Sequence, residues 1–178
     1  HGEGVPWNLL KTSDLVQFHE LGEVLSRGSA EEQDLFVFTG SVFQSKDKFY
    51  IFYTGHNYHL AESQRPMQAI LLAESDDLVH WTKRPDFRLE APSVYEKHDF
   101  RDPFVFYDES EHQYKMLLAG RLKTGLYRER GCTIMATSHD LFHWDVNPIP
   151  FYAPHRFYTH ECPDLFRIGP WYYDRKSH

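Results

Sequence analysis

Short apolar runs, separated by polar or Gly- and Pro-containing turns, recur along the whole of this 178-residue chain. The runs are rich in aromatic and β-branched side chains, which is typical of β-strands. Several are paired around a tight polar turn, which predicts β-hairpins. No long amphipathic helix is apparent, and the acidic segment 31–34 is expected to be a solvated loop. The predicted hairpins pair 38–43 with 49–55, 102–107 with 114–120, and 163–168 with 171–173.

A second pattern repeats at a fixed interval. Three segments share a short apolar strand, a polar turn and then the sequence Asp-Leu-x-x-aromatic. Equal spacing with matching residues indicates a structural repeat. The aspartates follow one another at steps of 63 residues: Asp14, Asp77 and Asp140. We interpret the closing aromatic residues as structural, because every repeat has one: Phe18, Trp81 and Trp144.

Each repeat contains about four strands, so the sequence predicts an all-β fold of the β-propeller type, in which each blade is a four-stranded sheet. The repeat divides the chain into full blades at about 19–81 and 82–144, with parts of two others at 1–18 and 145–178. We expect residues 1–178 to belong to one propeller domain. Because a closed propeller needs at least about four blades, we expect the chain to be part of a larger one.

Charge and composition narrow the possible partners. The formal net charge of −7 argues against nucleic acid or an anionic membrane, because both require a basic surface. No apolar run is long enough to span a membrane. No signal peptide is apparent, but the chain begins at His1 and an upstream segment is expected to be missing, so localisation stays open. A small-molecule or oligosaccharide substrate fits this composition, and the oligomeric state is open.

The sequence lacks the motifs that metal binding, phosphate binding and nucleophilic-serine catalysis require. Cys132 and Cys162 have no CxxC spacing and are expected to be free thiols. The histidines form no HExxH motif or close His/Cys cluster, so we expect no metal. Neither a phosphate-binding glycine loop nor a nucleophilic-serine motif is present, and we expect no cofactor.

Two predicted strands begin with a carboxylate close to a proline. Phe-Arg-Asp-Pro occupies 100–103 and Glu-Cys-Pro-Asp occupies 161–164. Asp102 and Glu161 would face each other if the fold brings these strand starts together. Paired carboxylates hydrolyse glycosides, one exchanging a proton and the other attacking or stabilising the sugar. The structural alternatives are an Arg101–Asp102 surface pair and a solvent-facing Glu161.

The order of these motifs resembles glycoside hydrolase family 32, which comprises invertases, levanases, inulinases and other β-fructofuranosidases. The resemblance rests on the repeat at 75–81, the Phe-Thr-Gly-Ser turn at 38–41 and the two carboxylate motifs, and it covers essentially the whole chain. It implies a five-bladed propeller with its site in the central channel. By motif, Glu161 would be the general acid/base and Asp102 the transition-state stabiliser. The implied substrate-binding residues are Arg101, Phe38, Thr39, Trp7 and Cys162.

The family's nucleophile is an Asp in an Asn-Asp-Pro motif, which this sequence lacks. One step of the repeat back from Ser41 places that position about 20 residues before His1. Two functions are therefore weighed: a retaining hydrolase of β-D-fructofuranosyl linkages of the sucrose, inulin or levan type, and a carbohydrate-binding or inactive propeller without the nucleophile. The Glu-Cys-Pro motif at 161–163 argues against a related propeller glycosidase that acts on arabinosides or xylosides. The sequence does not separate exo from endo cleavage, or hydrolysis from transfer.

Overall fold

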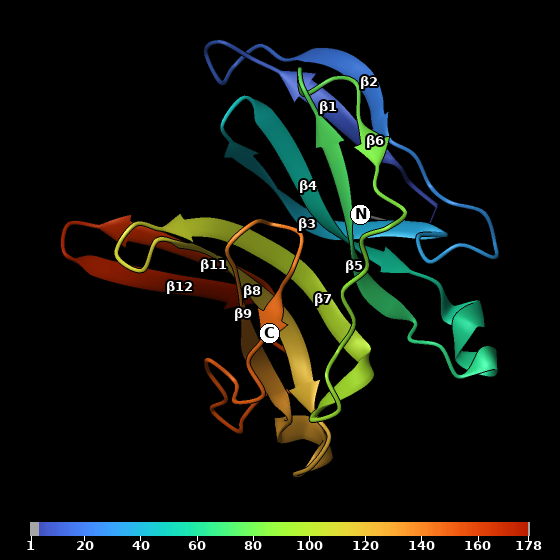
Figure 1. Cartoon of the computed structure of the whole chain (residues 1–178), viewed down its shortest axis with the longest axis vertical. Helices are drawn as coiled ribbons and strands as arrows, with labels where there is room; N and C mark the ends of the chain where they lie inside the picture. The colour runs from blue at the N-terminus through green and yellow to red at the C-terminus, as the bar shows by residue number, and fades with distance from the viewer. Residues whose placement is uncertain (1–3, 178) are drawn as a thin grey trace.

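The computed structural model describes residues 4–177, which form β-strands joined by loops and two short 3-10 helices (Figure 1). The all-β prediction is confirmed. The helices are η1 (Tyr58–Ser63) and η2 (Tyr127–Glu129). The strands are β1 (Trp7–Lys11), β2 (His19–Leu25), β3 (Phe36–Ser45), β4 (Lys48–His56), β5 (Gln68–Ser75), β6 (Thr82–Lys83), β7 (Tyr95–Asp108), β8 (Gln113–Leu122), β9 (Gly131–Ser138), β10 (Asp145–Val146), β11 (Glu161–Ile168) and β12 (Trp171–Ser177).

The strands form two four-stranded antiparallel sheets of the kind found in propeller blades. One has the order β3-β4-β5-β6 and the other β7-β8-β9-β10, while β1–β2 and β11–β12 are two-stranded. Asp14 follows β1 as Asp77 follows β5, so β1 and β2 are the counterparts of β5 and β6. β11 carries a bulge and pairs with β12 as β7 does with β8, so β11 and β12 correspond to the first two strands of a blade.

The two four-stranded sheets span residues 36–83 and 95–146. The repeat predicted blade boundaries at 19–81 and 82–144, so the two divisions differ. The segment 19–25 forms β2 and pairs with β1 instead of joining the sheet of β3 to β6. The repeat determines only the distance between equivalent residues, whereas strand pairing determines where a blade begins. The five-blade count and the single domain over 1–178 stay predictions.

The main hydrophobic cluster joins the two four-stranded sheets. Phe52 and Ile70 of the first sheet and Met116 and Leu118 of the second are fully buried in it. Trp144 packs against the cluster, with its ring edge-to-face to that of Phe52 at 5.6 Å between centroids. The closing aromatic of this repeat therefore packs between blades.

A second, smaller cluster attaches β2 to the first sheet through Leu25, Val37 and Ile51. Trp7 and Trp81 pack against it. The third closing aromatic, Phe18, is exposed. Its counterparts Trp81 and Trp144 each donate an indole N–H to a turn carbonyl at 2.8 Å, a bond that a Phe ring cannot make.

The acidic segment 31–34 lies in a loop, but it is not fully solvated as expected. Asp34 is buried, accepts a hydrogen bond from the Tyr53 hydroxyl at 2.9 Å, and pairs with the Lys83 ammonium. Gln33 is also buried and donates to the carbonyl of Gly55. The partners come from β4 and β6, so this burial depends on contacts that a local acidic pattern does not reveal.

The Asp-Leu turn has the same backbone hydrogen bonds in all three copies. In the third, Asp140 Oδ1 accepts from the N–H groups of Phe142 and His143, both at 2.8 Å. Leu141 has a left-handed backbone with φ 73°, as do Leu15 and Leu78 in the other copies. His143 Nδ1 lies 2.7 Å from Asp140 Oδ2, so this histidine is part of the turn.

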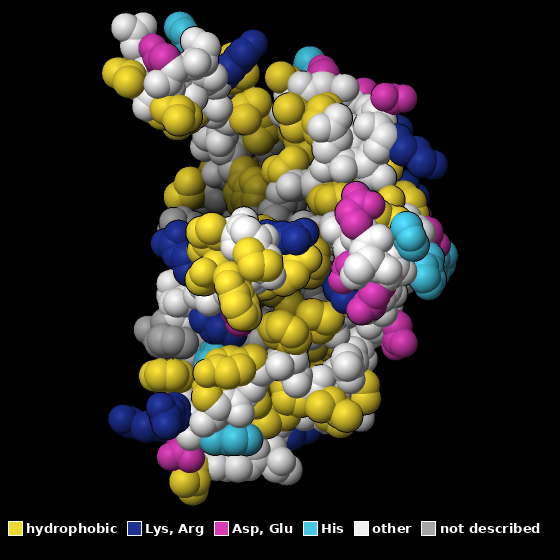
Figure 2. Space-filling view, turned by 90° about the vertical axis from the view of Figure 1, so that its left-hand side faces the viewer, with side chains coloured by type: hydrophobic (Ala, Val, Ile, Leu, Met, Phe, Trp, Pro, Cys, Tyr) yellow, Lys and Arg dark blue, Asp and Glu magenta, His cyan; other side chains and the backbone are white. Residues whose placement is uncertain are grey.

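The β11–β12 hairpin carries several large exposed apolar side chains, including Ile168, Trp171 and Tyr172. The hairpin extends to the left in Figure 1, and Figure 2 looks onto that side and shows hydrophobic side chains gathered there. Within residues 4–177 β12 pairs on one side only, so the hairpin forms an open sheet edge. None of the helices in this range is long and apolar enough to cross a membrane.

We expect Asp140→Ala to lower the free energy of unfolding by about 1 kcal/mol, because two backbone N–H groups lose a charged acceptor. The bond to His143 and those backbone groups hold the pKa of Asp140 below its ordinary range. A lowered folded-state pKa stabilises the fold fully above the unfolded-state pKa, and this stabilisation is lost progressively as pH falls from there through the folded-state pKa. The difference from wild type should therefore shrink below about pH 4.

Urea unfolding at pH 7 and pH 2 measures this difference, because the lower pH approaches the folded-state pKa of Asp140. The exposed neighbour variant His139→Ala is the control and should unfold like the wild type. An equal loss of stability at both pH values would contradict the role given to the Asp140 carboxylate.

Candidate active site

Strands β3, β7 and β11 share the same irregularity in their pairing. The pairing register slips at residues 37–40 of β3, 101–104 of β7 and 161–164 of β11. A β-bulge of this kind turns neighbouring side chains toward one face of a strand whose side chains would otherwise alternate. Each strand therefore presents two consecutive residues to one cavity: 38–39, 101–102 and 161–162.

The bulges of β7 and β11 are held by a shared set of hydrogen bonds. Asp102 and Cys162 each precede a proline and have left-handed backbones, with φ 57° and 49°. Such a conformation costs a non-glycine residue about 1–3 kcal/mol, so the surrounding contacts must stabilise it. Asp102 N–H donates to Thr54 Oγ1 at 2.8 Å, and Cys162 N–H donates to the Asp102 carboxylate at 2.9 Å. The second bond ties the two bulges together.

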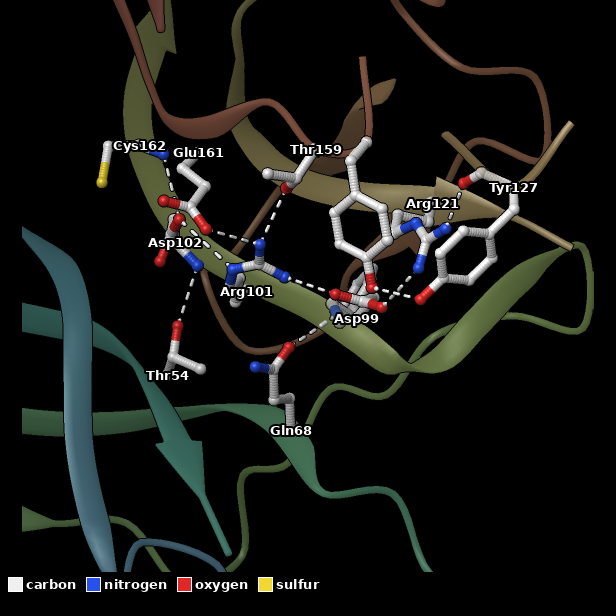
Figure 3. A network of polar contacts seen from close by, with 12 residues as sticks. Thr54, Gln68, Asp99, Arg101, Asp102, Arg121, Tyr127, Thr159, Glu161 and Cys162 are labelled. Atoms are coloured by element: carbon white, nitrogen blue, oxygen red, sulfur yellow. Dashed lines mark hydrogen bonds and ion pairs between the residues drawn. The ribbon is translucent and has the colours of Figure 1, made fainter. Parts of the chain in front are cut away.

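Arg101 connects the carboxylates of the site (Figure 3). Its guanidinium donates to Glu161 Oε1 at 2.9 Å, to Asp99 Oδ1 at 2.8 Å and to Thr159 Oγ1 at 2.7 Å. Its Nε lies 3.8 Å from Asp102 Oδ2. Burial acts to lower the pKa of Arg101, but the charges of Asp102 and Asp99 outweigh it and raise that pKa. A permanent cation therefore stands among three carboxylates.

The two predicted catalytic carboxylates have different surroundings. Asp102 is 5% exposed, and burial raises its pKa, while the Cys162 N–H bond and the Arg101 charge act in the opposite direction. The Glu161 side chain is 48% exposed and reaches solvent. The geometry suits Asp102 to a fixed charge beside a ligand, and Glu161 to proton exchange with a ligand or water.

The cavity at the bulges has a volume of about 290 Å³ and contains six of the seven predicted site residues. They are Arg101, Asp102, Glu161, Cys162, Phe38 and Thr39. Phe38 is oriented by stacking on His56, with 4.7 Å between ring centroids. The seventh, Trp7, packs against the second hydrophobic cluster and is not among the residues that line this cavity.

The cavity is also lined by two residues that the sequence did not indicate as site residues. Asp99 binds Arg101 and also lies 3.3 Å from Arg121 Nη1. It stands just before the Phe-Arg-Asp-Pro motif, and that proximity was the only signal that could have found it. Gln68 Oε1 accepts from the Phe100 N–H at 3.0 Å. Gln68 begins β5, and no local motif marks it.

Neither cysteine is activated as a nucleophile. Both thiols are free, as predicted. Burial raises the pKa of Cys132 to about 12 and also raises that of Cys162, so the thiol form is favoured in both. In the part of the chain from 4 to 177, no three His, Cys, Asp or Glu side chains are grouped so as to hold a metal ion.

Blade-like sheets whose strands bring a buried Asp and an exposed Glu to one cavity define a propeller of the glycoside-hydrolase type. Residues 1–176 match the family described as the glycosyl hydrolases family 32 N-terminal domain, and the chain belongs to this family. The resemblance seen in the sequence motifs is thereby confirmed.

The relatives are longer than this chain. A sucrose-6-phosphate hydrolase of Staphylococcus xylosus is 26% identical over 165 residues, which are 92% of this chain and 31% of that protein. An insoluble isoenzyme of beta-fructofuranosidase from Arabidopsis thaliana is 28% identical over 168 residues, 92% of this chain and 28% of that protein. The chain therefore spans about a third of the length of the curated relatives it matches.

A solved structure shares the fold. The GH32 beta-fructofuranosidase of Bombyx mori superposes with a TM-score of 0.76 at 22% identity, over 96% of this chain and 34% of that one. A mutant of the same Bombyx protein has been solved in complex with sucrose. At this identity the likeness shows the fold alone.

We expect Asp102→Asn to raise the thermal stability at pH 7. Because burial raises the folded-state pKa of Asp102, the folded protein binds the proton more tightly, and ionisation lowers stability as pH rises from the unfolded-state pKa through the folded one. Asn is close in shape and still accepts the Cys162 N–H bond. The gain should vanish below about pH 4, where both states are protonated.

Thermal unfolding at pH 7 and pH 3.5 tests this expectation, with the exposed turn variant Asp47→Asn as the matched control. A lower melting temperature for Asp102→Asn at pH 7 would show that the carboxylate charge stabilises the site.

Proposed function

We propose that the protein containing this chain is a retaining hydrolase of β-D-fructofuranosides, with Glu161 as general acid/base and Asp102 as the stabiliser of charge on the sugar. The observation that carries the proposal is the junction of the two bulges, where Cys162 N–H bonds the Asp102 carboxylate and Arg101 bonds Glu161. These contacts place residues 60 positions apart in the sequence around one cavity.

The chemistry follows from the two environments. The exposed Glu161 can donate a proton to the leaving oxygen and then take one from water. The buried Asp102, once ionised, can hold sugar hydroxyls and stabilise the positive charge that develops at the anomeric carbon. Arg101 fixes the orientation of Glu161. The attacking carboxylate of the family belongs to an Asn-Asp-Pro motif, which this sequence does not contain.

Sucrose, inulin and levan are the candidate substrates that the family resemblance implies, and the curated relatives are named for sucrose 6-phosphate and fructofuranosides. Phe38 and Thr39 line the cavity beside the carboxylates, and their contact with the fructosyl ring is part of the proposal. Trp7 is assigned no sugar contact, because it packs in the second cluster. The rival function, a propeller that binds carbohydrate without cleaving it, makes no use of Glu161 as an acid.

We expect Glu161→Gln in the complete protein to reduce fructose release from sucrose by about 10²–10⁴-fold, because glutamine cannot exchange the proton. Sugar binding should persist, since the amide keeps the shape of the side chain. Initial rates of fructose release and the affinity for fructose measure the two effects.

The matched control is Glu109→Gln, the same change at an exposed position beyond the far end of β7. Full turnover by Glu161→Gln would refute the acid/base assignment. A complete wild-type protein that binds fructosides and releases no fructose would favour the rival binding function.

A further inference from the structure

The loop between β8 and β9 lies at the same end of its blade as the catalytic cavity. Near the end of β8, Ala119 and Gly120 pair with Arg101 and Phe100. The segment 123–130 that follows, including η2, therefore begins beside the site. Figure 3 shows Tyr127 of this loop beyond Arg121, on the side of Asp99 that faces away from Glu161.

Two exposed tyrosines contact each other beside this loop. Tyr127 of η2 is 63% exposed, and Tyr158, from the segment leading into β11, is 40% exposed. Their rings lie edge-to-face with centroids 5.3 Å apart, and their hydroxyls are 3.5 Å apart. We call this pair the tyrosine platform. Two rings with adjacent hydroxyls offer an apolar surface with polar tips, which suits a ligand that has C–H faces and hydroxyls.

Buried arginine holds the platform rigid and joins it to the cavity. The Arg121 guanidinium carbon lies 3.6 Å from the Tyr158 ring centroid and 4.8 Å from that of Tyr127. Its Nη2 donates to the Tyr127 carbonyl at 2.7 Å, and its Nη1 bonds Asp99, which lines the catalytic cavity. The side chain is 3% exposed, so it supports the rings from beneath. Asp99 therefore links the arginine beneath the platform to the wall of the cavity.

We propose that the tyrosine platform binds the sugar that leaves when the fructosyl bond is cleaved, and so determines preference among fructosides. This inference rests on the proposed function, which places the fructosyl unit at Asp102 and Glu161. A pyranose such as the glucosyl unit of sucrose presents C–H groups for the ring faces and hydroxyls for the tyrosine hydroxyls.

The charges beneath the rings favour a neutral sugar. Arg121 is paired with Asp99, and Arg130, which lies 5.4 Å from the Tyr127 ring centroid, is paired with Glu96 at 2.6 Å. These two cations are already neutralised. A phosphorylated sugar would instead have to use the exposed Lys123 and Arg128 of the same loop. Sucrose 6-phosphate is therefore the second ligand in the test.

Calorimetric titration in the Glu161→Gln background tests the platform without turnover. Fructose, sucrose and sucrose 6-phosphate are titrated into the complete protein and into its Tyr127→Ala variant. We expect Tyr127→Ala to weaken sucrose binding about tenfold and to leave fructose binding unchanged, because only sucrose reaches the platform. Tyr127→Phe keeps the ring and should stay within about twofold of the parent.

The matched control is Tyr107→Ala. Tyr107 forms the same edge-to-face pair with Tyr114, 5.0 Å between centroids, near the far end of β7. Its removal should leave both affinities unchanged.

The outcomes separate the two proposals. Unchanged sucrose affinity in Tyr127→Ala, or an equal loss of affinity for fructose and sucrose, overturns the platform. Fructose binding by the parent Glu161→Gln protein leaves the proposed function standing in either case. Binding of no sugar by the folded Glu161→Gln protein overturns both. Tighter binding of sucrose 6-phosphate than of sucrose overturns the neutral occupant.

Discussion

The site depends on one backbone constraint, the β-bulge that recurs at 37–40 of β3, 101–104 of β7 and 161–164 of β11. Without it, side chains would alternate and each strand would offer one residue to the cavity instead of two. The bulge of β7 places the cation of Arg101 beside the carboxylate of Asp102. The bulge of β11 presents Glu161 beside Cys162. The hydrogen bond from Cys162 N–H to Asp102 makes the two bulges support each other.

Charge balance around Arg101 explains how so many ionised groups share a small space. Asp99, Asp102 and Glu161 all approach this guanidinium, and Arg121 neutralises Asp99 from the other side. A buried ion pair returns its desolvation cost only when its remaining hydrogen bonds are also satisfied. The bond from Arg101 to Thr159 meets part of that requirement. The network therefore positions the exposed Glu161 through buried partners.

The site also carries energetic costs that the packing between blades must offset. Asp102 is buried with a raised pKa, and its backbone and that of Cys162 lie in the left-handed region. The cluster around Phe52, Ile70 and Leu118 holds the sheets on which these residues stand. Strained and desolvated groups at a functional site, supported by a well-packed scaffold, are the pattern expected of binding and catalytic centres.

The sequence by itself determined the strands, the repeat and the residues of the two carboxylate motifs, because apolar alternation, turn chemistry and spacing are local properties of the chain. It also indicated Phe38 and Thr39 through their motif. Only the tertiary structure decided that β2 pairs with β1, that Trp7 packs against the second cluster, and that Asp34 is buried. The parts played by Asp99 and Gln68 likewise appear only there. Each of these depends on strand register and on partners distant in the sequence, which no local pattern encodes.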